Sequence, residues 1–242
     1  GSYASSTTYI TGMATQHAAM ELRENIIKIA AGMLGCTEEA LEFDGGKVYR
    51  LDGTASVSLS DISTKSQVNN TIPVDVTATY SSPVSPPPYM AGMVEIELDK
   101  ETGSIEILDY QAVIDCGIPV NPNLARVQAE GGIGQGIGMA LYENVTYDAD
   151  GRIAENSLMQ YKIPTREDIR NVHVEFETSY EPTGPFGVKS IGEIVINTPA
   201  PALAHAIYRA TGVWHRTVPF TPEKILMRMI DPQWQENDRR VQ

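Results

Sequence analysis

Cysteine and histidine are scarce in this chain of 242 residues, which has two cysteines and four histidines. Cys36 and Cys116 lie far apart, and no CxxC pair or Cys/His spacing accompanies them. The sequence therefore encodes neither a disulfide framework nor a zinc or iron–sulfur site of its own. Because free thiols are typical of a reducing compartment, we predict a cytoplasmic protein.

Long apolar runs and basic runs are also missing. No stretch approaches the roughly twenty consecutive apolar residues of a membrane span, and no signal-peptide pattern opens the chain, so we predict no membrane partner. The net charge is −13, and the first basic pair is Arg239-Arg240 in the tail. This charge opposes binding to phosphate backbones, so nucleic acid is not an expected partner.

Apolar residues make up 42% of the chain, enough for a substantial core. Their periodicity predicts helices at 11–34, 121–143, 198–210 and 222–229, with a helical turn at 59–63. It predicts strands at 41–43, 47–51, 55–58, 90–98, 104–114, 145–147, 153–154 and 172–176. The proline-rich residues 83–88 form a stiff connector. We therefore predict an α+β fold with two mixed α/β lobes, residues 1–82 and 83–242.

The most informative motif is Gly184-Pro-Phe-Gly-Val-Lys-Ser-Ile-Gly-Glu193. Its three glycines permit positive φ and close approach of a ligand to the main chain. Glu193 precedes an apolar stretch, and desolvation there would disfavour its charged form, which suits a general base. The alternative is a tight turn in which Glu193 caps the helix that follows.

A second glycine-rich segment follows Gln128, with glycines alternating from Gly132 to Gly138. It is not a dinucleotide fingerprint, because GxGxxG requires a glycine three residues after its second glycine. Ile137 stands at that position after Gly134, and Met139 stands there after Gly136. It can be a helix with a small-residue face that packs against another backbone. It can also be a helix that lies against a ligand.

The chain opens with a third unusual segment, residues 4–8, which reads Ala-Ser-Ser-Thr-Thr and precedes the first predicted helix. Hydroxyls and free N–H groups ahead of a helix attract phosphate. A helix N-cap accounts for one or two of these residues, but not for all of them.

Together the three segments resemble, in the same order, the xanthine dehydrogenase and aldehyde oxidase family of molybdenum hydroxylases. The resemblance extends from residue 1 to about residue 230, and it identifies the chain as the C-terminal part of a molybdenum cofactor-binding large subunit. One departure is Tyr3, where many relatives carry Arg, and this bears on the substrate class.

The resemblance implies roles for particular residues. Glu193 becomes the active-site base, Lys189 orders its turn, and Gln128 contacts the pterin. The backbone N–H of Ala4 lies beside the molybdenum ligands, and the metal is held through the pterin without a direct protein ligand. The remaining implied cofactor-binding residues are Ser5, Ser6, Thr7, Thr8, Gly192 and Lys189 itself.

The implied activity is hydroxylation of an N-heterocycle or aldehyde, with water as the oxygen source. The implied cofactor is molybdopterin, in the cytosine dinucleotide form, with molybdenum. FAD and iron–sulfur clusters belong to partner chains or missing domains. The expected partners are the upstream part of the large subunit, an iron–sulfur subunit, an FAD subunit and a small-molecule substrate.

Two other functions remain open. The isolated chain, expected to be inactive, can be a catalytically silent fragment. It can also be an assembly subunit that completes the site only with a partner chain.

Overall fold

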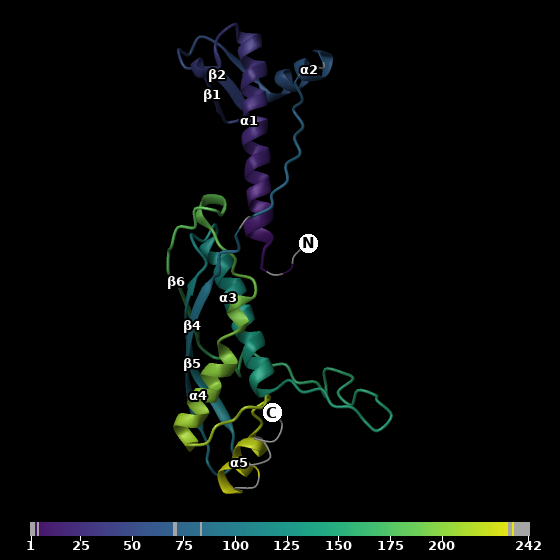
Figure 1. Ribbon diagram of the computed structural model, residues 1–242, viewed down its shortest axis with the longest axis vertical. Coiled ribbons are helices and arrows are strands. Elements are labelled where there is room, and N and C mark those ends of the chain that lie inside the picture. The colour runs from purple at the N-terminus through teal and green to yellow at the C-terminus, as the bar shows by residue number, and fades with distance from the viewer. Residues whose placement is uncertain (1–2, 4, 70–71, 83, 232–233, 235–242) are drawn as a thin grey trace. The chain divides into compact units, whose positions relative to one another are not determined.

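A computed structural model describes residues 3, 5–69, 72–82, 84–231 and 234, which form two compact units (Figure 1). The smaller unit is Thr8–Val84, and the larger unit runs from Ser85 onward and includes the segment up to Thr7. The expected boundary between residues 82 and 83 lies two residues from this division. The opening Ser/Thr segment is split, because Ser5, Ser6 and Thr7 group with the larger unit.

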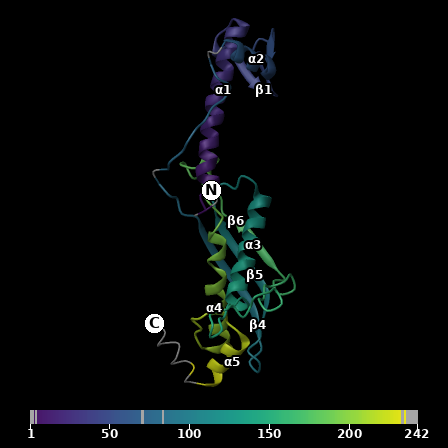
Figure 2. The ribbon, with the colours of Figure 1, turned by 90° about the vertical axis from the view of Figure 1, so that its right-hand side faces the viewer.

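The smaller unit is built on a long helix, α1 (Gly12–Leu34), which follows a π-helical turn at Thr7–Thr11. The helix ends where Gly35 adopts the left-handed conformation and donates its N–H to the Ala31 carbonyl, as the sequence predicts. Strands β1 (Leu41–Asp44), β2 (Lys47–Arg50) and β3 (Ser56–Ser58) form an antiparallel sheet. Figure 2 shows this sheet beside the C-terminal half of α1, where the buried isoleucines of that helix lie.

Helix α2 (Leu59–Asn69) is longer than the predicted turn at 59–63. Its sequence is mostly polar, so apolar periodicity gives little signal beyond the first turn. The Ser58 hydroxyl and the Asp61 carboxylate hydrogen-bond to each other and to each other's backbone N–H, which forms a capping box at the start of the helix. Ile62 is fully buried and holds the helix against the small core.

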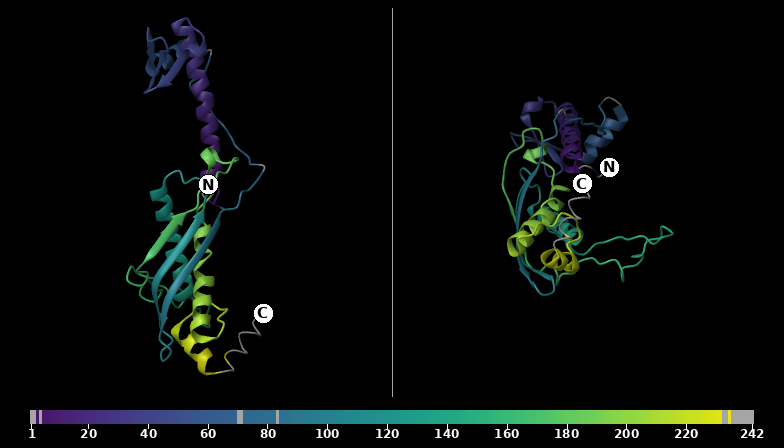
Figure 3. Two further views of the ribbon diagram at one scale, coloured as in Figure 1. Left: turned by 90° about the vertical axis from the view of Figure 1, so that its left-hand side faces the viewer. Right: turned by 60° about the horizontal axis from the view of Figure 1, so that its bottom comes forward.

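The larger unit contains a three-stranded sheet of β4 (Tyr89–Leu98), β5 (Ile105–Asp115) and β6 (Val172–Phe176). The order is β4-β5-β6, with β4 antiparallel and β6 parallel to β5. Helices α3 (Pro122–Leu141) and α4 (Pro199–Thr211) cover one face of the sheet, and α5 (Pro222–Ile230) follows (Figure 3). The predicted strands at 145–147 and 153–154 are wrong, because a single bridge between Tyr147 and Ile153 joins these exposed segments.

The core of the larger unit lies between the sheet and the helices. Its fully buried side chains include Tyr110 and Ile114 from β5, Ile133 and Ile137 from α3, and Leu203 from α4. The predicted α+β class is confirmed. Within the described ranges, no helix combines the length and apolarity needed to cross a membrane.

Candidate functional site

The structure brings Ser5 and Glu193 together although they stand 188 residues apart. The Ser5 hydroxyl accepts the Glu193 backbone N–H at 2.7 Å and donates to Glu193 Oε2 at 3.0 Å. The Ser5 hydroxyl oxygen accepts a hydrogen bond from the Glu193 N–H, and the Ser5 hydroxyl proton points to the Glu193 carboxylate. One serine therefore orients both the main chain and the side chain of Glu193.

Ser5 lies in a strained turn. Its φ of 53° falls in the left-handed region, which costs a non-glycine residue on the order of 1 kcal/mol or more. The Ser6 N–H and hydroxyl both hydrogen-bond to the Tyr3 carbonyl, at 3.1 and 2.9 Å, and close the turn. A Cβ at Gly192 would lie 3.3 Å from the Ser5 hydroxyl oxygen, so glycine at this position permits the close approach of the two segments.

Gln128 joins the same cluster from the first half of α3. Its side-chain amide donates to the Gly192 carbonyl at 2.8 Å. The start of the helix is fixed by Pro122 in its first turn and by Asn121, whose side chain accepts the Leu124 N–H. The capped helix in the middle of the chain and the strained turn near its start thus both contact residues 192 and 193.

The glycines of α3 position the segment that follows Glu193. A Cβ at Gly132 would lie 2.2 Å from Val195 Cγ2, and a Cβ at Gly136 would lie 2.6 Å from Pro199 Cγ. Both distances are shorter than atoms tolerate, so glycine is needed where this segment crosses the helix. The alternative of a small-residue face packed against another backbone is confirmed at these two positions.

Lys189 is buried, and its side chain pairs with Asp115. Its ammonium lies 2.5 Å from Asp115 Oδ2 and 5.4 Å from the centre of the Tyr89 ring. Asp115 Oδ1 accepts the Ser179 hydroxyl at 2.6 Å and the Gly117 N–H at 3.0 Å. Burial raises the pKa of Asp115, but the hydrogen bonds from Lys189, Ser179 and Gly117 outweigh it and hold the pKa below its usual value.

Main-chain hydrogen bonds also join the glycine-rich turn to the residues that follow β5. Lys189 donates its N–H to the Cys116 carbonyl at 2.7 Å, and Ile118 donates to the Gly187 carbonyl at 2.9 Å. A Cβ at Gly117 would lie 2.3 Å from that same Gly187 oxygen. The residue that sequence reasoning missed is Asp115, the partner of Lys189; the available signal was a carboxylate at the end of an apolar strand, directly before Cys-Gly.

The environment of Glu193 differs from the sequence expectation in two ways. Its side chain is exposed, so the expected desolvation is not provided by the described part of the chain. Glu193 precedes the short 3₁₀ helix Ile194–Ile196, but its side chain makes no capping hydrogen bond there. The capping alternative is therefore wrong, because the carboxylate is used by Ser5 instead.

The other predicted contacts are distributed as follows. Thr7 and Thr8 are exposed, and Thr8 belongs to the smaller unit. Ala4 lies outside the described residues. Cys116 is buried, and burial together with the neighbouring Asp115 carboxylate raises the pKa of its thiol.

The polar groups of this cluster bond to one another. The Ser5 hydroxyl donates to the Glu193 carboxylate, the Ser6 hydroxyl to the Tyr3 carbonyl and the Gln128 amide to the Gly192 carbonyl. Within the described ranges, His, Cys, Asp and Glu form no group of three that would bind a metal directly.

The sequence matches the molybdopterin cofactor-binding domain family over residues 1–170, well over half of the chain. The chain therefore belongs to this family, whose relatives here are molybdenum-binding subunits of the xanthine dehydrogenase type. The matched region includes Ser5 and Gln128, and the turn that carries Glu193 lies beyond it.

Individual relatives align over nearly the whole chain. The probable hypoxanthine oxidase XdhD of Escherichia coli (strain K12) is 39% identical over 228 residues, which are 93% of this chain and 24% of that protein. The 6-hydroxypseudooxynicotine dehydrogenase complex subunit gamma of Paenarthrobacter nicotinovorans is 34% identical, over 94% of this chain and 30% of that subunit. The chain thus spans about a quarter to a third of the length of these relatives.

Solved structures show the same fold. The crystal structure of quinoline 2-oxidoreductase from Pseudomonas putida 86 superposes with a TM-score of 0.81 at 27% identity. The superposition covers 96% of this chain and 31% of that one.

Proposed function

We propose that this chain forms part of the molybdopterin site of a xanthine dehydrogenase-like hydroxylase, with Glu193 as the general base. The observation that carries the proposal is the pair of hydrogen bonds between Ser5 and Glu193. A general base must be held in one orientation near the proton that it removes. Ser5 supplies this orientation from the segment that the resemblance places beside the cofactor.

The two carboxylate oxygens of Glu193 then have different tasks. Oε2 accepts the Ser5 hydroxyl proton and fixes the plane of the carboxylate. Oε1 has no hydrogen-bond partner among the described residues, so it is the oxygen that takes the proton from the attacking water-derived oxygen. When bound, the molybdenum–pterin group supplies the two-electron redox chemistry. The proposed substrate class is an N-heterocycle or an aldehyde.

The proposed cofactor contacts are those that the resemblance to the family implies. Hydroxyls of Ser5, Ser6, Thr7 and Thr8 bind the pterin and its phosphate, Gln128 contributes its amide, and the Ala4 N–H lies beside the metal ligands. Gly192 lets the cofactor approach the main chain. Lys189 acts by ordering the turn through Asp115, without touching the cofactor. We further propose the cytosine dinucleotide form of the pterin.

Electron transfer requires groups that this chain does not supply. We propose that an iron–sulfur subunit and an FAD subunit accept the electrons and that the rest of the large subunit completes the site. The shares of 24% and 30% of the lengths of its relatives support the proposal that further chain of the large subunit completes the site. A cytoplasmic location is consistent with the two free cysteines.

Substitution of Glu193 in the complete, molybdenum-loaded enzyme tests the assigned role. Glu193→Gln should lower turnover by at least about a hundredfold while molybdenum content stays unchanged, because a general base is lost and the shape is kept. Ser5→Ala should lower turnover less, because the base remains but loses its orientation. Glu175→Gln, an exposed carboxylate on β6, is the matched control. Near-normal turnover of Glu193→Gln would disprove the role.

The competing function is a silent fragment or an assembly subunit that is complete only with a partner chain. The exposed carboxylate of Glu193 favours it, because a working base is normally enclosed. Molybdenum and released pterin nucleotide, measured per chain by elemental analysis and mass spectrometry, decide the question. About one of each per isolated chain would mean that these residues suffice to hold the cofactor. None would favour the fragment or assembly role.

A further inference from the structure

Strand β4 stands at one end of the sheet, so one of its edges has no neighbouring strand among the described residues. It is ten residues long, and its pairing with β5 is regular from Tyr89 to Glu95, before a register shift between Glu95 and Ile96. Natural proteins usually shorten, charge or cover such an edge, because its free N–H and C=O groups attract another strand. The part of β4 that precedes Glu95 contains no proline and no charged residue, so this part is expected to have a partner.

Hydrogen bonds of β5 reveal which main-chain groups of β4 face outward. The Tyr110 N–H bonds to the Asn171 carbonyl, and the Ile114 carbonyl accepts the Glu177 N–H, so these two β5 residues direct their main chain toward β6. Main-chain groups alternate in direction along a strand. The β5 residues that point toward β4 are Gln111, Val113 and Asp115.

The pairing of β4 with β5 shows which main-chain groups of β4 point toward β5 and which point outward. The partners of those three β5 residues are Met93, Ala91 and Tyr89. Met90, Gly92 and Val94 alternate with these residues along β4. Their N–H and C=O groups therefore face the free edge. An added strand would pair with these three residues at the usual spacing of about 4.8 Å.

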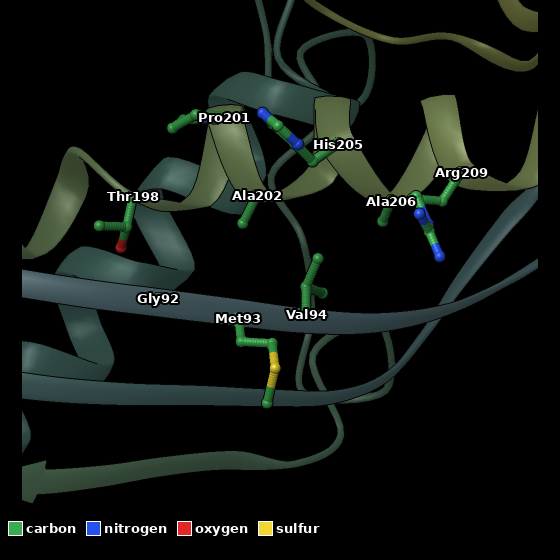
Figure 4. A pocket seen from close by; sticks show the side chains of 9 residues that line it. All are labelled: Gly92, Met93, Val94, Thr198, Pro201, Ala202, His205, Ala206 and Arg209. Atoms are coloured by element: carbon green, nitrogen blue, oxygen red, sulfur yellow. The ribbon is translucent and has the colours of Figure 1, made fainter. Parts of the chain in front are cut away.

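A pocket of about 390 Å³ lies beside this edge, between β4 and α4. Figure 4 shows Ala202, Ala206 and Arg209 directed from α4 toward the strand, and Val94 directed from β4 toward the helix. The pocket therefore lies on the face of β4 over which the inward-facing side chains of an added strand would project. An edge strand beside an apolar helix face is a recurring arrangement for binding extended peptides.

The basic side chains at the pocket indicate which kind of segment would bind there. Arg209 and His205 are exposed at its wall, and Arg209 forms no ion pair within the described part of the chain. His205 packs edge-on against Trp214, with ring centres 4.9 Å apart. A second copy of this chain is disfavoured, because two chains of net charge −13 repel each other.

We propose that the free edge of β4 and the adjoining pocket bind an extended segment from the part of the molybdenum-binding subunit that lies outside this region in its relatives. The matched region is 24% of one relative and 31% of another, so most of each relative's chain lies outside it and can supply such a segment. The segment adds a strand to β4, places apolar side chains over the pocket and sets a carboxylate near Arg209. This inference rests on family membership and is independent of the role of Glu193.

Amide hydrogen exchange of β4 tests the proposal, comparing the isolated chain with the assembled enzyme that contains it. In the isolated chain, the amides of Ala91 and Met93 should exchange slowly, and those of Met90, Gly92 and Val94 should exchange fast. In the assembled enzyme the latter three should slow by at least about tenfold, because strand pairing protects them. Fast exchange of these amides in the assembled enzyme would overturn the proposal.

Two variants test the same edge by assembly yield. Val94→Pro removes one outward N–H, which an edge strand tolerates, and Val94→Ala removes a similar part of the side chain but keeps the N–H. Val94→Pro should lower the yield of assembled enzyme severalfold more than Val94→Ala, and equal yields would contradict strand addition. Slow exchange of all these amides in the isolated chain, together with a doubled mass, would instead identify a second copy and overturn the proposal.

Discussion

The buried ion pair between Asp115 and Lys189 should dominate the stability of the larger unit near the Glu193 turn. Its side chains are 19% and 8% exposed, and the two charged atoms lie 2.5 Å apart. Removal of one partner of a buried pair costs about 3–5 kcal/mol, because the remaining charge is left without compensation. We therefore perturb each partner with a substitution that conserves its size.

The two substitutions should differ in cost. Asp115→Asn leaves the Lys189 ammonium buried without a counter-charge, so we expect a loss of about 3 kcal/mol in the free energy of unfolding. Lys189→Met leaves a carboxylate that keeps its bonds from Ser179 and Gly117 and is more exposed, so we expect about 2 kcal/mol. The double variant should cost about 1–2 kcal/mol less than the sum of the two, because neither charge is then left alone.

Tryptophan fluorescence during urea unfolding isolates the larger unit. The chain has two tryptophans, Trp214 and Trp234, and both belong to that unit. The signal thus follows its unfolding without a contribution from Thr8–Val84. The midpoint and the slope of each curve together give the free energy of unfolding.

The ion pair between Arg170 and Glu106 is the matched control, because it lies in the same unit with side chains 59% and 46% exposed. Exposed pairs contribute at most about 1 kcal/mol, so Glu106→Gln should change little. If Asp115→Asn costs no more than Glu106→Gln, the argument from burial is wrong.

Two further predictions concern the pH dependence of the Asp115 ion pair and the glycines of α3. Because the pKa of Asp115 is held below its usual value of about 3.9, its stabilising contribution is complete above that pH and is lost as the pH falls through the lowered pKa. Urea unfolding between about pH 5 and 2 should therefore show a shallower loss for Asp115→Asn than for the unsubstituted chain, and equal slopes would contradict the assignment. Gly136→Ala should cost about 1–3 kcal/mol, since its Cβ would lie 2.6 Å from Pro199. Gly131→Ala, with nothing within 4 Å, should be neutral or stabilising in the same unfolding assay.

The helices and the long strands were predictable because their signals are local. Gly35 and Gly212 both adopt the left-handed conformation just beyond α1 and α4, where the sequence places helix ends. The Gly103 turn similarly marks the hairpin between β4 and β5. The start of α2 was predicted but its full length was not, because its stability comes from a capping box and one buried isoleucine. The predicted short strands near Tyr147 failed because their exposed segments share only one bridge and join neither described sheet.

The candidate site was predictable as a set of segments but not as a geometry. Local pattern identified the Ser/Thr segment and the two glycine-rich segments separately, and the resemblance added Gln128. Nothing local shows that the Ser5 hydroxyl meets the Glu193 carboxylate, because that contact depends on the packing of segments 188 residues apart. The exposure of Glu193 was missed for the same reason, since apolar neighbours in sequence did not become neighbours around its carboxylate.

The two interpretations of the glycine-rich helix are complementary. Gly132 and Gly136 are required by contacts with Val195 and Pro199, and four residues before Gly132 the Gln128 amide holds the Gly192 carbonyl. These contacts lie along one face of α3, since residues about four apart share a helix face. The glycines therefore act on the proposed base indirectly, by letting its segment lie flat on a rigid helix. A side chain added at Gly136 would displace that segment even if it never touched the cofactor.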